Sequence, residues 1–265
     1  MLQTASFVRY SPARIASIAD VIEALDLIVQ ECARTQNRAG YFAALYKRMT
    51  IAVSEGIAKG SFEDGPRMEQ LDMIFAGRYL AAFDAFQRNE ACSTSWHCAF
   101  TGCGNRSLVV LQQLILGINT HINLDLAIAA AQIEPGEKIA ALEKDFNNIN
   151  TLIASLVDDI QHCLEEVWFP MRWIDKIANK QEQAVLNFNI GIARKVAWDN
   201  AVLLAKMNAT EQAAHIKGMD EMVKTIGNRI INPGLWPQLL LRIIRFSEFG
   251  DVARTIRLID TTVVN

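Results

Sequence analysis

The stretch 107–133, SLVVLQQLILGINTHINLDLAIAAAQI, decides the fold. Its apolar residues recur at helical spacing. It contains no Lys, Arg or Glu, the residues that a solvated helix face normally carries. Its polar residues Asn119, His121, Asn123 and Asp125 are too many for a span that faces lipid. The stretch therefore predicts a central helix that is surrounded by protein on most sides.

Helical periodicity continues on both sides of this stretch, and strand signals are nearly absent. No internal repeat and no long linker divides the chain. The pattern predicts an all-α fold, a single-domain bundle over residues 1–265 with about eight to ten helices around the central one. Pro, Gly and capping residues place the predicted helices at 18–34, 40–59, 66–88, 93–100, 106–132, 137–167, 181–207, 210–231 and 236–259, the last interrupted near Gly250.

Composition narrows the class of protein. Of the 265 residues 51% are hydrophobic and 21% are charged, which is typical of a chain with a sizeable core. The formal net charge of -3 gives no sign of a nucleic-acid partner. Met1–Tyr10 lacks the pattern of a secretory signal, and five cysteines make an odd number. We therefore expect free thiols and a cytoplasmic location.

Polar residues inside the central helix are the first candidates for a site. His121 and Asp125 stand one turn apart within its apolar sector, and Asn119 and Asn123 follow a stripe beside them. Buried polar groups must find partners. Under a structural interpretation, His121 and Asp125 bond each other or neighbouring helices and fix the packing. Under a functional one they are catalytic, with Asn119 and Asn123 binding the ligand.

The segment 66–88 offers a second set of polar side chains. Asp72 falls within an apolar face, while Glu69 and Arg78 border that face. A carboxylate in such surroundings needs a partner or a raised pKa. The structural interpretation is an ion pair between Asp72 and Arg67 or Arg78. The functional one is an acid, a base or a metal ligand that faces the central helix.

Three other polar residues are interpreted as having no role in a site. Asp158 and His162 project away from the apolar side of the 137–167 segment, so we expect both to be exposed and dispensable. Asp199 projects near apolar residues of the 181–207 helix, and we interpret it as one half of a salt bridge.

Several motifs resemble one family. They are Tyr41–Tyr46, Phe62–Glu69, Phe75–Leu80, Trp96 with Phe100, and above all Leu116–Leu126 with its Gly-x-Asn-x-His-Ile-Asn-x-Asp-Leu string. Together they resemble an uncharacterised bacterial and fungal family that is catalogued as a domain of unknown function. The resemblance is good over residues 38–126 and loose elsewhere. It implies no activity, but it falls on the segments that the burial argument selects.

Two functions compete. The first is an enzyme with His121, Asp125 and Asp72 as catalytic residues, which hydrolyses a small or lipid-like molecule. A divalent metal ion, held by His121, Asp125 and Glu69, is a candidate cofactor. The alternative is a non-catalytic helical module that binds an apolar ligand or a protein partner, with Arg78, Trp96 and Glu69 among the ligand-binding residues. Its pocket would be lined by Tyr79, Phe83, Phe86, Trp96 and Phe100. We expect a small-molecule ligand, no nucleic acid and no transmembrane segment, and we consider a homodimer.

Overall fold

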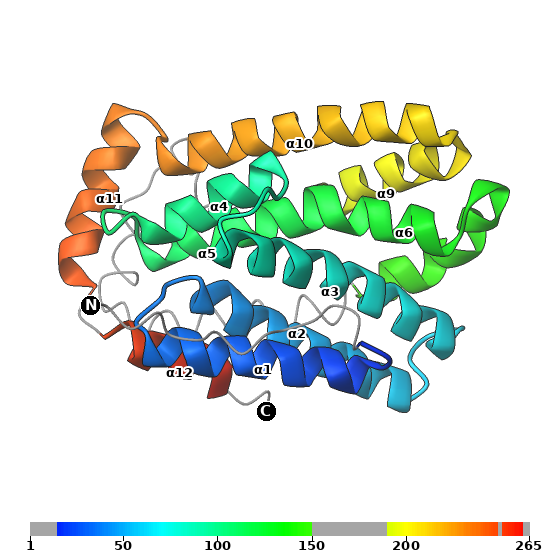
Figure 1. The fold of residues 1–265 in the computed structure, drawn as a ribbon, viewed down its shortest axis with the longest axis horizontal. Helices are drawn as coiled ribbons and strands as arrows, with labels where there is room; N and C mark the ends of the chain where they lie inside the picture. The colour runs from blue at the N-terminus through cyan, green and yellow to red at the C-terminus, as the bar shows by residue number, and fades with distance from the viewer. Residues whose placement is uncertain (1–14, 150–189, 249–250, 262–265) are drawn as a thin grey trace.

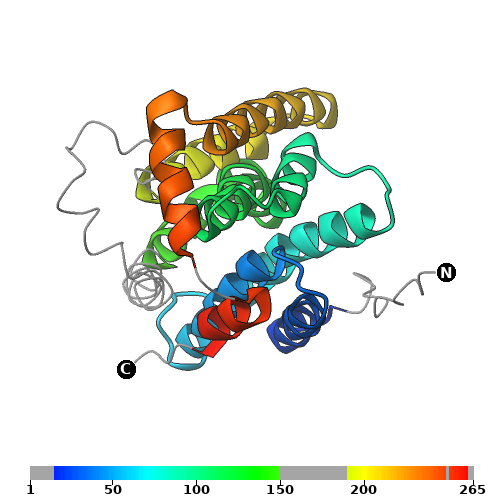
Figure 2. The same ribbon diagram turned by 90° about the vertical axis from the view of Figure 1, so that its left-hand side faces the viewer.

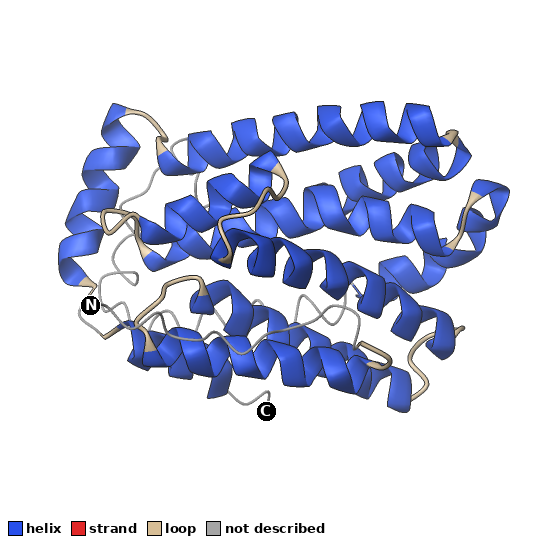
Figure 3. Ribbon diagram, viewed as in Figure 1, coloured by secondary structure: helices blue, strands red, loops and turns tan. Residues whose placement is uncertain are grey.

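The computed structural model describes residues 15–149, 190–248 and 251–261. Within these ranges the chain is helical and contains no strand, which confirms the all-α prediction (Figure 3). With the central run α5–η2–α6 taken as one, the described part has nine α-helices. The elements are α1 (Ile18–Arg34), α2 (Gly40–Ala58), α3 (Gly65–Gln87), α4 (Thr94–Gly104), α5 (Val110–Thr120), η2 (His121–Leu126), α6 (Ala127–Ile133), η3 (Gly136–Leu142), α9 (Ile190–Lys206), α10 (Ala209–Ile231), α11 (Leu235–Ser247) and α12 (Val252–Thr261).

The helices lie in layers around the central run (Figure 1). α1, α2 and α12 pack together on one side, while α9 and α10 cover the other. The view at right angles shows α5 and α6 between these two layers, with α3 beside them (Figure 2). This arrangement buries the central run from several directions at once.

Local sequence signals explain where the helices begin. Asp64 caps α3 by accepting a hydrogen bond from the Arg67 N–H at 3.0 Å, and Pro66 sits in the first turn, where an N–H is not needed. Ser17 caps α1 in the same way through the Asp20 N–H. Both helix starts fall within about one residue of their predicted positions.

The structure differs from the predicted elements in three places. The segment expected to begin as a helix at Glu137 starts with the 3₁₀ helix η3. α4 runs through Gly104 instead of ending near Phe100. The central helix is not α-helical throughout, because η2 is a π-helical turn that begins at His121. Such turns insert one extra residue into a helix and occur frequently at functional sites. The expected interruption of the last helix is present, since α11 and α12 are separate.

Val110–Ile133 is long and apolar enough to cross a membrane, but 83% of its most apolar window is buried inside the protein. The core helix of a soluble protein has this composition, as the sequence predicts for this stretch. Asp158 and His162 lie outside the described residues, as does the beginning of the helix expected from Gln181.

Candidate functional site

The site starts from two residues of the π-helical turn. His121 and Asp125 are 3% and 1% exposed, which confirms that both are buried. The Nδ1 atom of His121 lies 3.2 Å from Oδ2 of Asp125. Since a carboxylate only accepts hydrogen bonds, Nδ1 carries the hydrogen of this bond. The central helix thus supplies an imidazole whose orientation is fixed by a carboxylate one turn away.

Asp125 is held by two further donors from neighbouring helices. Arg78 of α3 donates from Nε to Oδ1 at 2.9 Å, and Trp96 of α4 donates from Nε1 to Oδ2 at 2.8 Å. The carboxylate therefore has a cationic partner and a hydrogen bond on each oxygen, as a buried charge requires. Three helices meet at this one side chain.

The other ring nitrogen of His121 is in a different situation. Nε2 is buried and has no hydrogen-bond partner among the described residues. Burial lowers the pKa of His121 below its usual 6.5, against the opposing effect of the Asp125 hydrogen bond. The imidazole is therefore neutral at pH 7. With its hydrogen on Nδ1, a neutral imidazole offers Nε2 as a free proton acceptor.

Aromatic rings enclose the imidazole. Phe75 of α3 stacks on it with the ring centroids 3.6 Å apart and the planes 9° apart. Tyr46 of α2 meets its edge at 4.4 Å. The rings of Phe42, Tyr79 and Trp96 lie at 5.7, 6.0 and 6.0 Å.

Tyr46 and Asp72 add two more buried polar atoms without well-formed hydrogen bonds. The Tyr46 hydroxyl lies near Thr50 but makes no hydrogen bond of good geometry, and Oδ2 of Asp72 has no partner in the described chain. Burial, followed by the charge of Glu69, raises the pKa of Asp72 to about 7. Burial, followed by the charges of Asp72 and Asp125, raises the pKa of Tyr46 well above its usual value. Tyr46 thus lies within electrostatic reach of both carboxyls.

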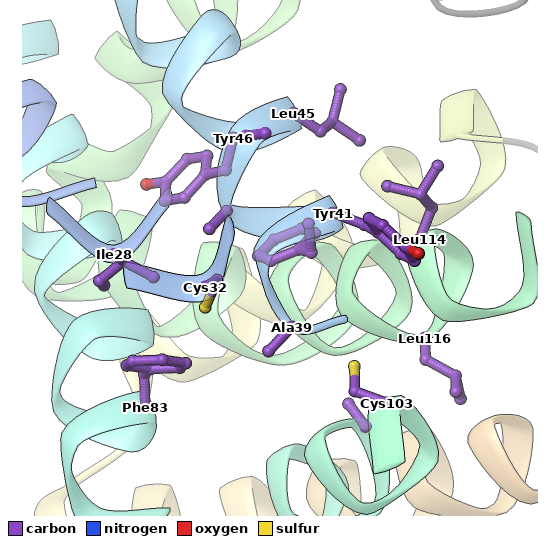
Figure 4. Packing of buried hydrophobic residues seen from close by; sticks show 14 of the residues in the cluster. Ile28, Cys32, Ala39, Tyr41, Leu45, Tyr46, Phe83, Cys103, Leu114 and Leu116 are labelled. Carbon is purple, nitrogen blue, oxygen red and sulfur yellow. The ribbon is translucent and has the colours of Figure 1, made fainter. Parts of the chain in front are cut away.

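Tyr46 reaches this position because α2 is buried on nearly all sides over its first turns. Figure 4 shows Tyr46 and Leu45 leaving α2 toward different sides. Opposite them, Gly117 of α5 allows close approach, since a Cβ there would lie 2.4 Å from the ring of Phe42. The close packing of α2 against α5 therefore brings the aromatic residues of α2 to His121.

The structure separates the predicted site residues into two groups. His121, Asp125, Arg78 and Trp96 are joined by direct hydrogen bonds. Asp72 makes no such bond to them, and its charge acts on Tyr46, as that of Asp125 does. Asp72 is 7% exposed, as expected for a buried residue. Its proposed arginine partners are engaged elsewhere: Arg78 with Asp125, and Arg67 with Asp64, Glu134 and Asp145.

The remaining predicted residues make packing contacts. Glu69 accepts a hydrogen bond from the Ile18 N–H at 3.1 Å and so connects α3 to α1. Asn119 donates to the Val223 carbonyl of α10, and Asn123 donates to Asn119. These bonds favour the structural interpretation of both amides.

The hypothetical metal set does not form a ligand shell. Both oxygens of Asp125 already accept N–H groups, and Glu69 is bound to the start of α1. Over the ranges that the structure describes, no group of three or more His, Cys, Asp or Glu side chains is placed to hold a metal ion.

The proposed aromatic pocket is also packed. Trp96 stacks on Phe100 at 5.0 Å, and Phe83 and Phe86 contact the Phe100 ring. These rings form part of the core and leave Trp96 facing Asp125.

Sequence reasoning missed Tyr46 and Phe75 as site residues. Nothing in the spacing of Phe75 indicates that it stacks on an imidazole. A signal for Tyr46 does exist, because a tyrosine within a helix that is buried all round must bury its hydroxyl.

Comparison with known proteins agrees with the resemblance. The model of a family of unknown function, DUF5995, matches residues 18–233 of the chain. The matched region includes all the residues of the site described above. No curated protein and no solved structure matches the chain.

Proposed function

The chain belongs to DUF5995, a family of unknown function, and from the site alone we propose that the protein is an acid–base enzyme that hydrolyses a small, largely apolar molecule. The observation that carries this proposal is the asymmetry of His121. One nitrogen is fixed by Asp125, whereas the other is buried, neutral and without a partner. A general base needs this arrangement of an oriented imidazole with a free acceptor nitrogen.

An ester is the simplest group that such a site would hydrolyse. Nε2 of His121 takes a proton from a water molecule while the water oxygen bonds to the carbonyl carbon. The bond to the alcohol oxygen then breaks, and this oxygen takes the proton back from His121. The products are a carboxylic acid and an alcohol, and no other reactant is needed.

Each neighbour has a role in this scheme. Asp125 holds the imidazole in place and stabilises its transient positive charge. Arg78 and Trp96 fix Asp125 through their hydrogen bonds. Asp72, whose pKa is raised to about 7, is the alternative to His121 as proton donor to the leaving oxygen.

The proposal is tested by hydrolysis of p-nitrophenyl acetate and butyrate. We expect His121→Gln to lower kcat/KM by a factor on the order of 10² to 10⁴, the usual contribution of a general base. The matched control is His97→Gln. His97 is exposed, and exposed imidazoles hydrolyse activated esters slowly without a built site. This variant therefore measures the background rate and should leave kcat/KM nearly unchanged. Equal rates for wild type and His121→Gln, with the fold intact, would contradict an enzyme of this kind.

The non-catalytic module remains the second candidate, favoured by the aromatic rings around His121. In that case the site binds a ligand but turns over no ester. We also propose a cytoplasmic location, supported by free thiols at Cys32, Cys92, Cys98 and Cys103, which cell fractionation would test. The homodimer stays a prediction for analytical ultracentrifugation.

A further inference from the structure

Three buried polar atoms on neighbouring residues have no well-formed hydrogen bond: Nε2 of His121, the hydroxyl of Tyr46 and Oδ2 of Asp72. The Tyr46 ring lies 4.4 Å from the His121 ring, and the Asp72 carboxyl acts electrostatically on Tyr46. The Tyr79 hydroxyl is also unpartnered, but the groups that act on it are Cys32 and Cys103. Each of the three atoms comes from a different helical segment, namely η2, α2 and α3. A buried polar group without a hydrogen bond destabilises the fold, so three such atoms together are unfavourable for folding alone. A bound molecule that pairs with them would remove this cost.

The charges around these three atoms cancel. Arg78 and Asp125 form an ion pair, with 1% of the Asp125 side chain exposed. His121 is neutral at pH 7, and Tyr46 is neutral because burial holds its pKa well above the usual value. Asp72 is the remaining ionisable group, with its pKa raised to about 7. While Asp72 is protonated, an anion or cation brought here would be desolvated without a free charged partner among the residues named, which is costly in the interior.

The surroundings of the His121 ring are aromatic. Phe42, Phe75, Tyr79 and Trp96 lie within 3.6–6.0 Å of the His121 ring, measured between centroids. Rings at such distances favour flat apolar groups. Of the residues that contact the His121 ring or hydrogen-bond to Asp125, Phe75 and Arg78 of α3 are only partly buried. This face of α3 is therefore where a ligand approaches His121.

We propose that the site binds an uncharged molecule with a flat apolar body and one hydroxyl or similar group that hydrogen-bonds to His121, Tyr46 and Asp72. This inference rests on the proposed function and names the chemical class of its substrate. It distinguishes the protein from enzymes that act on phosphates or carboxylates, whose sites present unpaired cationic groups. Ordered water is the competing occupant, since water also satisfies buried polar atoms.

Calorimetric titration with four small probes tests the inference. Phenol is the expected ligand, and toluene has the same shape without the hydroxyl. Benzoate and benzylammonium carry a negative and a positive charge on a similar body. We expect phenol to bind at least about tenfold more tightly than toluene, because a site built to pair a hydroxyl discriminates against the analogue that lacks it. At pH 6, where Asp72 is mostly protonated, neither ion should bind measurably.

Two variants connect the binding to the named atoms. Tyr46→Phe, which removes one unpartnered hydroxyl, should bring the affinities for phenol and toluene closer together. Asn123→Ala is the control, because Asn123 bonds to Asn119 and not to the three atoms. It should leave the ratio of the two affinities unchanged.

Several outcomes would overturn the inference. The first is no binding of phenol, which is expected if the site holds tightly bound water only. The second is binding of toluene with the same affinity as phenol. The third is binding of benzoate or benzylammonium more tightly than phenol. The ester assay reports separately on catalysis. Hydrolysis that depends on His121 without phenol binding refutes the ligand class and leaves the enzyme, whereas phenol binding without hydrolysis refutes the enzyme and leaves the ligand class.

Discussion

Asp125 accepts three N–H groups. In contrast, Nε2 of His121, the Tyr46 hydroxyl and Oδ2 of Asp72 have no well-formed hydrogen-bond partner in the described chain. This contrast at the residue scale decides which substitutions are informative. Asp125→Asn would weaken the Arg78 contact and destabilise the fold under either a structural or a functional interpretation. Substitutions at the residues with unpartnered atoms separate the two interpretations, because these atoms make no well-formed hydrogen bond whose loss would destabilise the fold.

The Tyr46 hydroxyl provides the first such test. Removing it in Tyr46→Phe should leave the free energy of unfolding within about 0.5 kcal/mol of wild type or raise it, because the buried hydroxyl makes no good hydrogen bond. The control is Ser95→Ala, since the buried Ser95 hydroxyl donates to Oδ1 of Asp220 and its loss should cost about 1.5–3 kcal/mol. Urea unfolding measures both. A larger loss for Tyr46→Phe than for Ser95→Ala would mean that the Tyr46 hydroxyl is structural.

Asp72 gives the second residue-scale prediction, through pH. Its folded pKa of about 7 exceeds the usual 3.8, so the folded protein holds a proton that the unfolded chain releases above pH 4. Stability from this group is therefore present at low pH and is lost as the pH rises from about 4 to about 7. Asp72→Asn removes this loss.

The measurement is the free energy of unfolding at pH 5 and pH 8. Relative to wild type, Asp72→Asn should be more stable at pH 8 than at pH 5. Asp199→Asn is the control, because Asp199 is an exposed residue paired with Lys195. A difference that is the same at both pH values would show that Asp72 is not held neutral by burial.

At the scale of the element, the close approach of α2 and α5 builds the aromatic surroundings of His121. Gly117→Ala should destabilise the fold by about 1–3 kcal/mol, because its Cβ would lie 2.4 Å from Phe42 and force that ring to move. Gly77→Ala in α3 is the matched control, with nothing within 4 Å of the added Cβ. It should raise stability by about 0.5–1 kcal/mol, the helix propensity of alanine over glycine. Thermal or urea unfolding that ranks the two variants in the opposite order would contradict the packing described here.

The elements also mark the limits of what sequence can predict. Caps and breakers such as Asp64 and Pro66 placed helix ends well, because they act locally. The π-helical turn at His121 was missed, since residues four apart share a face in either helix type and the apolar pattern hardly changes. Asp199 shows the same limit. It forms the expected salt bridge, and its partner is Lys195. Helical spacing places it beside apolar residues, but these include the exposed Val196, so this face does not belong to the core.

For the molecule as a whole, the buried central helix follows from the sequence, and its partners do not. The absence of Lys, Arg and Glu from 107–133 predicts burial, and the structure confirms it. Which arginine meets which carboxylate depends on how α3 and α4 pack against η2. The pairing of Arg78 with Asp125, and the lack of a partner for Oδ2 of Asp72, therefore required the three-dimensional arrangement.

Four helical segments, α2, α3, α4 and η2, together determine the state of one imidazole, and this is the central claim of the account. The most direct measurement is ¹⁵N NMR of the His121 ring at pH 7, assigned by comparison with His121→Gln. We predict a neutral ring with its hydrogen on Nδ1, bonded to Asp125, and with Nε2 unprotonated. A ring protonated on Nε2 would contradict the account, because Nε2 would then be a donor and not the free base that the proposed reaction needs.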